Sequence, residues 1–322
     1  MIKILKIIGA VLLVLIGGAV LFNYHPDISI ERLKDKYTYP DSRFVAVEGM
    51  DVHYRAAGQG PVLLLLHGTG ASLHTWEIWT EELRDSFTII SLDLPAFGLT
   101  GPFPDREYSI AHYSSFINLF AQAINIDSFA LGGNSLGGLI AWKFASDYPA
   151  KVKELILLDA AGIPKPVDGE TPLAFRLAKN PVLATIMQKV TPKSLFRKSL
   201  HEVYGDPAKV TPELLQRYFE LFRRPGNRQA YVDRINQNEA RIDPSLLKNI
   251  TQPSLILWGE NDEWIPVENA NVFSELLPND TVIIYPGVGH LPMEEIPAQT
   301  AQDVRNFLML HRLPVLKEAV PQ

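Results

Sequence analysis

The sequence of 322 residues contains no cysteine. Disulfide bonds, thiol nucleophiles, iron–sulfur clusters and thiolate zinc sites are therefore excluded. The sequence also lacks an H-E-x-x-H zinc motif, a phosphate-binding Walker loop, a dinucleotide-binding glycine fingerprint and a basic stripe. Thirty basic and 36 acidic residues give a formal net charge of −6. We therefore expect no nucleic-acid partner, no metal and no organic cofactor.

Hydrophobic residues make up 47% of the chain and charged residues 20%, which is an ordinary balance for a globular protein. The chain contains no internal repeat and no low-complexity tract. Its length suits one large domain or two average ones.

The first residues are the most apolar part of the chain. Sixteen consecutive residues, Ile7–Phe22, carry no charge, close to the roughly 20 apolar residues that span a bilayer. Lys3 and Lys6 precede them, and basic residues favour the cytoplasmic side. The segment predicts a single-pass anchor in a bacterial inner membrane, with the rest of the chain in the periplasm. Gly17 and Ala19 also fit a signal-peptide cleavage site, so export after cleavage is the alternative.

Short apolar runs alternate with helical patterns from residue 44 onward. The expected strands lie at 45–47, 52–54, 61–66, 87–92, 128–131, 155–158, 254–258 and 281–285, and the expected helices at 72–84, 109–125, 136–148 and 298–310. Such alternation predicts a mostly parallel central sheet with helices on both faces.

One long stretch breaks this alternation. Residues 163–250 show helical patterns, dense apolar residues and no convincing strand. Because this insert lies between two sheet strands, we expect it to cover the edge of the sheet where ligands bind. The predicted organisation is as follows: 1–24 anchor or signal, 25–43 tether, 44–162 and 251–312 core, 163–250 helical lid, and 313–322 C-terminal tail.

Gly133-Asn-Ser-Leu-Gly137 follows an expected strand and opens an expected helix. This is the G-x-S-x-G pattern in the context that makes it a nucleophile turn. The glycines leave room for a sharp, strained turn, and Ser135 would project its hydroxyl at the positive end of the helix. Ser135 is therefore the candidate nucleophile.

A serine hydroxyl needs a base, and His290 is the candidate among eight histidines. It lies in Gly287-Val-Gly-His-Leu-Pro292, directly after the last expected strand. The base in turn needs an acid, and both Asp262 and Asp159 follow strands on the same edge of the sheet. We favour Asp262, which lies in a polar turn, and expect Asp159 to cap its own turn.

Four local features resemble the α/β-hydrolase fold superfamily. They are His67-Gly-Thr-Gly70 with Trp76, Asp93-Leu-Pro-Ala-Phe-Gly98, Gly133-Asn-Ser-Leu-Gly-Gly138, and the turns that hold Asp262 and His290. The resemblance covers about residues 43–312 and implies an oxyanion hole made of the backbone N–H groups of Thr69 and Leu136. Ala96 stands where the superfamily usually has a glycine.

Two subgroups are most similar, the bacterial family V lipases and esterases and the carbon–carbon bond hydrolases of ring-fission (meta-cleavage) products. The proline that usually follows the first glycines in the second subgroup is missing, because Ala71 and Ser72 follow Gly70. We therefore predict a serine carboxylic ester hydrolase that acts on a small-molecule ester or lipid. Arg223, Arg224 and Arg228 could bind an anionic dienoate or form a solvated turn, so carbon–carbon hydrolysis stays an alternative. A catalytically inactive binding protein is another.

Overall fold

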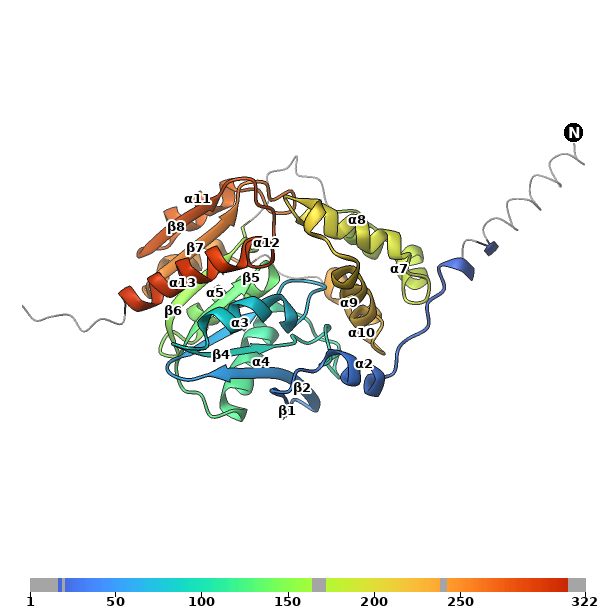
Figure 1. Cartoon of the computed structure of the whole chain (residues 1–322), viewed down its shortest axis with the longest axis horizontal. Coiled ribbons are helices and arrows are strands. Elements are labelled where there is room, and N and C mark those ends of the chain that lie inside the picture. Colours follow the sequence, from blue (N-terminus) through green and yellow to red (C-terminus); the bar gives the residue numbers. More distant parts are fainter. Residues whose placement is uncertain (1–16, 19–20, 164–171, 238–241, 312–322) are drawn as a thin grey trace, which may run out of the picture.

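The computed structural model describes residues 17–18, 21–163, 172–237 and 242–311. An eight-stranded sheet in the order β1-β2-β4-β3-β5-β6-β7-β8 runs through the domain (Figure 1). The strands are β1 (Ser42–Val47), β2 (Met50–Gly58), β3 (Val62–Leu66), β4 (Thr88–Leu92), β5 (Phe129–Asn134), β6 (Val152–Leu158), β7 (Ser254–Gly259) and β8 (Asp280–Tyr285). β2 pairs antiparallel with β1 and with β4, and every other pairing is parallel. The predicted mostly parallel sheet is confirmed.

Helices bury both faces of this sheet. Along β3, Leu63 and Leu65 join one buried cluster while Leu64 and Leu66 join the other, because side chains alternate along a strand. One face is covered by α3 (Glu77–Leu83) and α13 (Pro297–Leu310), and the opposite face by α4 (Ile110–Ala123), α5 (Leu136–Asp147) and α11 (Glu268–Leu276). The continuous apolar runs in the sequence therefore become strands buried on both sides.

The insert between β6 and β7 is helical, as expected. It comprises α6 (Leu173–Lys179), α7 (Pro181–Met187), α8 (Lys193–Val203), α9 (Pro212–Phe222) and α10 (Asn227–Asn236), with short 3₁₀ turns at Pro207–Lys209 and Pro244–Asn249. Within 172–237 and 242–250, the parts of the insert that the structure describes, no residue lies in a strand of the sheet. We call this insert the lid. Figure 1 shows α7 to α10 beside one edge of the sheet.

The prediction of a tether for 25–43 is wrong over much of its length. Ile30–Tyr37 forms the helix α2, and β1 begins at Ser42. The Ser29 hydroxyl caps α2 by accepting a hydrogen bond from the Arg32 N–H at 3.4 Å. Leu33 and Tyr37, four residues apart on one face of the helix, are buried and pack with Leu99 and Leu221. This i, i+4 pair makes the segment part of the domain.

The anchor predicted for residues 1–24 falls almost entirely outside the described residues. Only 17–18 and 21–24 of it are described. Within the described chain, no helix has both the length and the apolar character needed to cross a bilayer. The C-terminal tail, 313–322, also lies outside the described residues.

A buried carboxylate organises the turn after β4. Asp93 accepts hydrogen bonds from the N–H groups of Leu73 at 2.8 Å and Leu99 at 2.7 Å, and it pairs with His53 Nδ1 at 2.8 Å. Burial by itself would raise the pKa of Asp93, but the histidine lowers it to about 2. Ala96 in this turn has a φ of 84°, a backbone conformation that glycine adopts without strain.

Candidate active site

Ser135 lies at a strained turn between β5 and α5. Its φ of 54° and ψ of −114° are outside the regions that side-chain-bearing residues favour. The turn is held by its neighbours, because the Ser135 N–H donates to the Leu158 carbonyl at 3.0 Å and its carbonyl accepts from the Ala161 N–H at 3.0 Å. A Cβ on Gly133 or Gly137 would collide with neighbouring backbone atoms. The two glycines therefore permit the turn that presents the serine.

His290 and Asp262 form a buried pair. His290 Nδ1 lies 2.6 Å from Asp262 Oδ2. The other oxygen of Asp262 accepts the N–H groups of Trp264 at 2.7 Å and Ile265 at 2.9 Å. These three hydrogen bonds fix the carboxylate, and the carboxylate in turn orients the imidazole. Because Nδ1 bonds to Asp262, Nε2 is the ring nitrogen that can face another partner. Both His290 and Ser135 line the same cavity.

The loop that carries His290 is tied to both the core and the lid. The backbone carbonyl of His290 accepts a hydrogen bond from Asn134 Nδ2 at 3.0 Å, and the backbone N–H of His290 donates to the Val203 carbonyl of the lid at 2.8 Å. Glu295 accepts from the Gly289 N–H at 2.7 Å. Asn134 and Glu295 were missed by the sequence reasoning, although both lie inside or beside the motifs that identified the triad candidates.

Asp159, the alternative acid, lies next to this pair without bonding to the imidazole. It is fully buried, and its Oδ1 accepts the Gly259 N–H at 2.9 Å. Burial, and next the charge of Asp262, raise the pKa of Asp159 well above its usual range. Burial therefore favours the protonated form of Asp159 beside the carboxylate that orients His290.

Among the described residues, one group of His, Asp and Glu side chains is close enough to share a metal ion. It consists of Asp159, Asp262 and His290, whose possible ligand atoms lie within 4.8 Å of one another. The hydrogen bond between Asp262 and His290 already occupies one possible metal-binding atom of each residue. The geometry therefore fits a hydrogen-bonded dyad with a protonated neighbour better than a metal centre.

The two predicted oxyanion donors flank the nucleophile. Leu136 begins α5, where the first N–H groups of a helix have no intrahelical acceptor. Thr69 lines the cavity together with Ser135. A Cβ on Gly68 would crowd Asn134 and the Ser135 Cβ, so this loop approaches the nucleophile as closely as its glycine allows. His67 shapes the loop, as expected: its Nδ1 donates to the Gly68 carbonyl at 2.7 Å, and burial lowers its pKa.

The cavity over Ser135 is lined by apolar lid side chains. Its lid residues include Phe175, Met187, Leu195, Phe222 and Tyr231, and among the described residues its lining contains no Asp, Glu, Lys or Arg side chain. Because desolvating an unpaired charge is costly, such a cavity favours a neutral, apolar group. The same surroundings favour the burial of an acyl chain.

The three lid arginines have a role that the sequence did not predict. Arg223 donates to the Pro26 carbonyl at 2.8 and 3.0 Å, and Arg224 donates to the Leu99 carbonyl at 3.0 Å. Arg228 is buried and bonds to the His25 carbonyl at 2.9 Å and to Asp27 at 2.5 Å. The expectation of a solvated turn is therefore wrong for Arg228, and none of the three arginines lines the cavity. Arg223 and Arg228 fasten the segment before α2 to the lid, and Arg224 fastens the turn after β4 to it.

The serine at the strained strand–turn–helix, the buried acid–histidine pair and the helical lid are the arrangement typical of an α/β hydrolase. A model of the alpha/beta hydrolase fold family matches residues 61–297, and the chain belongs to this family.

The chain is similar to a lipase, to a dienoic acid hydrolase and to a phospholipase. Lipase 3 of Moraxella sp. is 28% identical over 256 residues, which are 77% of each chain. A 2-hydroxy-6-oxo-6-(2'-aminophenyl)hexa-2,4-dienoic acid hydrolase of Metapseudomonas resinovorans is 25% identical over 274 residues, 83% of this chain and 90% of that protein. The crystal structure of a bacterial membrane phospholipase A is similar over 98% of this chain and 100% of its own, with 28% identity and a TM-score of 0.74.

Proposed function

We propose that this protein is a serine hydrolase that cleaves carboxylic esters through an acyl-enzyme intermediate. The observation that carries the proposal is the position of Ser135 and His290 in one cavity whose described lining is mostly apolar and holds no Asp, Glu, Lys or Arg, with His290 held by Asp262. The similarity to a lipase and to a phospholipase supports the same chemistry.

The proposed reaction uses each group in turn. The Ser135 hydroxyl adds to the ester carbonyl while His290 Nε2 takes its proton, and the N–H groups of Thr69 and Leu136 stabilise the resulting oxyanion. The imidazolium then gives this proton to the leaving alkoxide as the carbon–oxygen bond breaks. Water, deprotonated by His290, adds to the acyl-enzyme, and the carboxylic acid leaves as Ser135 regains its proton. Asp262 stabilises the imidazolium in both halves.

The alternative, hydrolysis of a carbon–carbon bond in a ring-fission dienoate, has support from the similarity to a dienoic acid hydrolase. Such a substrate is anionic and needs a fixed cation near the reacting centre. The arginines that could have supplied one are bonded elsewhere. The apolar cavity therefore favours the ester.

Two measurements test the proposal. A fluorophosphonate probe should label the wild-type chain and fail to label the Ser135→Ala variant. Turnover of p-nitrophenyl esters from acetyl to long acyl chains should be compared with turnover of a ring-fission dienoate. A dienoate preferred by a wide margin would overturn the ester assignment and keep the nucleophile, whereas absence of both labelling and turnover in folded protein would favour an inactive binding protein.

We also propose that the uncharged segment Ile7–Phe22 holds the enzyme in a bacterial inner membrane with the catalytic domain in the periplasm. The similarity to a membrane phospholipase A over nearly the whole chain supports this location. N-terminal sequencing of protein purified from cells separates an anchor from export after cleavage. A mature chain that starts near Val20 would refute the anchor.

A further inference from the structure

The short helix α7 exposes apolar side chains on its outer side. Val182, Leu183 and Ile186 are 67%, 38% and 45% exposed, while Ala184 and Met187 on the inner side are buried. A surface helix of a soluble domain ordinarily directs polar side chains to water. This helix is instead largely apolar on both sides.

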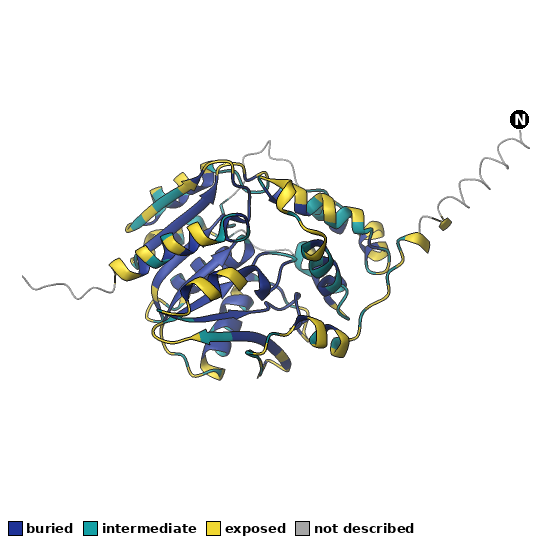
Figure 2. Ribbon diagram, in the orientation of Figure 1, coloured by how far each residue is buried: buried dark blue, intermediate teal, exposed yellow. Residues whose placement is uncertain are grey.

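A second apolar segment lies against the end of α7. Leu21, Phe22 and Tyr24 are 78%, 83% and 51% exposed. Tyr24 forms an antiparallel bridge with Val190, and the Thr191 N–H donates to the Asn23 carbonyl at 3.1 Å. In Figure 2, the segment before α2 runs close to α7 and is largely coloured as exposed.

Together these residues make one patch, which we call the apolar face; its members are Leu21, Phe22, Tyr24, Val182, Leu183 and Ile186. They are six of the ten exposed large hydrophobic residues in the described part of the chain. Apolar groups gathered in this way indicate an interaction surface, whereas scattered ones do not.

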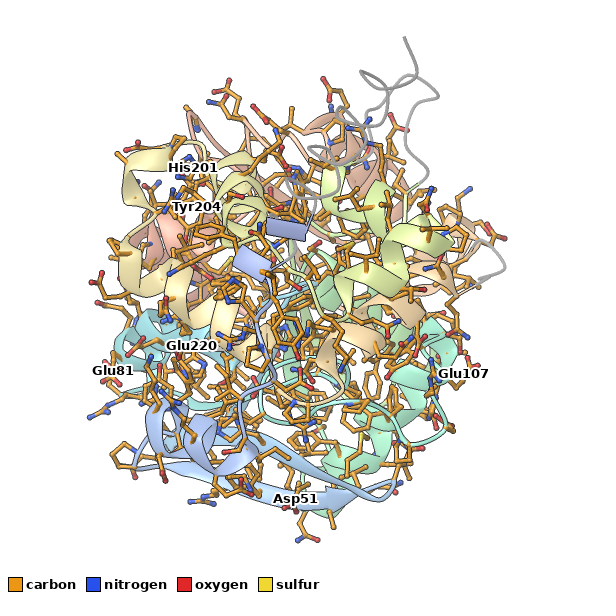
Figure 3. All side chains as sticks on the ribbon, turned by 90° about the vertical axis from the view of Figure 1, so that its right-hand side faces the viewer. Asp51, Glu81, Glu107, His201, Tyr204 and Glu220 are labelled. Atoms are coloured by element: carbon orange, nitrogen blue, oxygen red, sulfur yellow. The ribbon has the colours of Figure 1, made fainter. Side chains whose placement is uncertain are left out.

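The lid segment that carries α7 is basic. Residues 172–201 contain six basic side chains and no Asp or Glu, although the whole chain has a net charge of −6. Lys179 and Lys189 flank α7, and both are exposed. In Figure 3, which looks onto this side of the molecule, the labelled acidic residues Asp51, Glu81, Glu107 and Glu220 lie below the middle of the view.

We propose that the apolar face and its basic surroundings dock onto a bilayer that contains anionic phospholipid. Apolar side chains would enter the boundary of the acyl region while the flanking lysines pair with phosphates, the combination that binds interfacial helices to membranes. A second copy of the chain fits less well, because a symmetric contact would bring two sets of basic residues together. The surface is also continuous in sequence with the uncharged segment Ile7–Phe22.

The docked orientation would connect the bilayer with the cavity. Met187 lines the cavity over Ser135, while Ile186, the residue before it, belongs to the apolar face. The same helix would therefore contact lipid on one side and form the wall of the cavity on the other. The docking itself does not depend on the reaction that is proposed above.

The absence of cysteine allows a direct test on the full-length chain. Ile186→Cys would carry a single environment-sensitive fluorophore, and Ile284→Cys, on β8 and 38% exposed, would serve as the matched control. With vesicles of phosphatidylcholine and phosphatidylglycerol, we expect a blue shift and quenching by acyl-chain nitroxides at position 186 and neither effect at 284. Thermal unfolding of the two labelled variants checks that both are folded.

Charge reversal tests the electrostatic part. Lys179→Glu with Lys189→Glu should reduce the blue shift at position 186 to the level seen with phosphatidylcholine alone, and Lys153→Glu on β6 should leave it unchanged. A label at 186 that stays in water while the protein sediments with vesicles would overturn the proposal, as would protein that does not sediment at all. A shift that grows with protein concentration without vesicles would also overturn it, in favour of self-association.

Discussion

The catalytic edge of the core and the lid above it are built in different ways. In the core, backbone hydrogen bonds at the end of β6 fix Ser135, the N–H groups of its own turn fix Asp262, and the Asp262 carboxylate orients His290. In the lid, most of the side chains that line the cavity are apolar, and arginine side chains fasten it to the segment before α2 and to the turn after β4.

This difference suggests that the core carries out the chemistry and that the lid selects the substrate. Chemistry needs groups held in one geometry, which rigid strand ends supply. Selection of a substrate needs volume and apolar area, and several combinations of helical side chains can supply these. Core substitutions should therefore change the rate for every substrate, and lid substitutions should change which substrate is preferred.

The largest expected effect is at the nucleophile and the base. Ser135→Ala and His290→Ala should each lower kcat by about 10⁴-fold or more, and the double variant should be little worse, because the groups act as a unit. Steady-state kinetics with a medium-chain ester and circular dichroism of each variant provide the measurement. Additive losses in the double variant would contradict the shared role.

Substitution of the two neighbouring aspartates, Asp262 and Asp159, should have clearly different effects on kcat. Asp262→Asn should lower kcat by about 10⁴-fold because the imidazole loses its orienting carboxylate. Asp159→Asn keeps the shape of a side chain that does not bond to the imidazole and whose protonated form burial favours, so its kcat should stay within a few-fold of wild type. A larger loss in Asp159→Asn than in Asp262→Asn would reverse the acid assignment.

Asp159 should also leave a signature in the pH dependence of stability. Its pKa is raised in the folded state, so the folded protein keeps a proton that the unfolded chain releases. Its contribution to stability is therefore full below the unfolded pKa near 4 and declines as pH rises towards the folded pKa, by up to about 1.4 kcal/mol per pH unit. Urea unfolding across this range should show a smaller decline in Asp159→Asn. Equal slopes would show that Asp159 is ionised.

The fastening of the lid should be worth less than the chemistry of the core. Arg228→Met keeps a long side chain and removes the bonds to His25 and Asp27. We expect the free energy of unfolding to fall by about 1–3 kcal/mol, the usual range for hydrogen bonds to a charged group. Arg197→Met, at an exposed position on α8, is the control and should change little. If Arg228→Met left the free energy of unfolding unchanged, apolar packing alone would hold the lid.

The smallest expected effect distinguishes the two sides of one lid helix. Met187→Ala enlarges the cavity and should move the preferred acyl chain to longer esters, with kcat/KM changing about fourfold per added methylene, since each buried methylene contributes about 0.8 kcal/mol. Val182→Ala, on the outer side of α7, should leave the profile for soluble esters unchanged. Similar profiles in both variants would place the acyl site elsewhere.

The sequence by itself determined most of the core and the identities of the candidate triad. Continuous apolar runs such as Val62–Leu66 have one stable environment, a strand covered on both faces. The glycines around Ser135 and His290 mark turns where neighbouring backbone segments approach too closely for a side chain. Both signals are local, so they can be read without the fold.

The tertiary structure decided what depends on contacts between distant segments. Asp262 and Asp159 both follow strands on the same edge, and only the structure shows which one bonds to His290. The helix α2 depends on burial of Leu33 and Tyr37 against Leu99 and Leu221, more than 60 residues away in the chain. Arg228 bonds to Asp27 across 201 residues of sequence. Such partners leave no local pattern, because their burial comes from the rest of the fold.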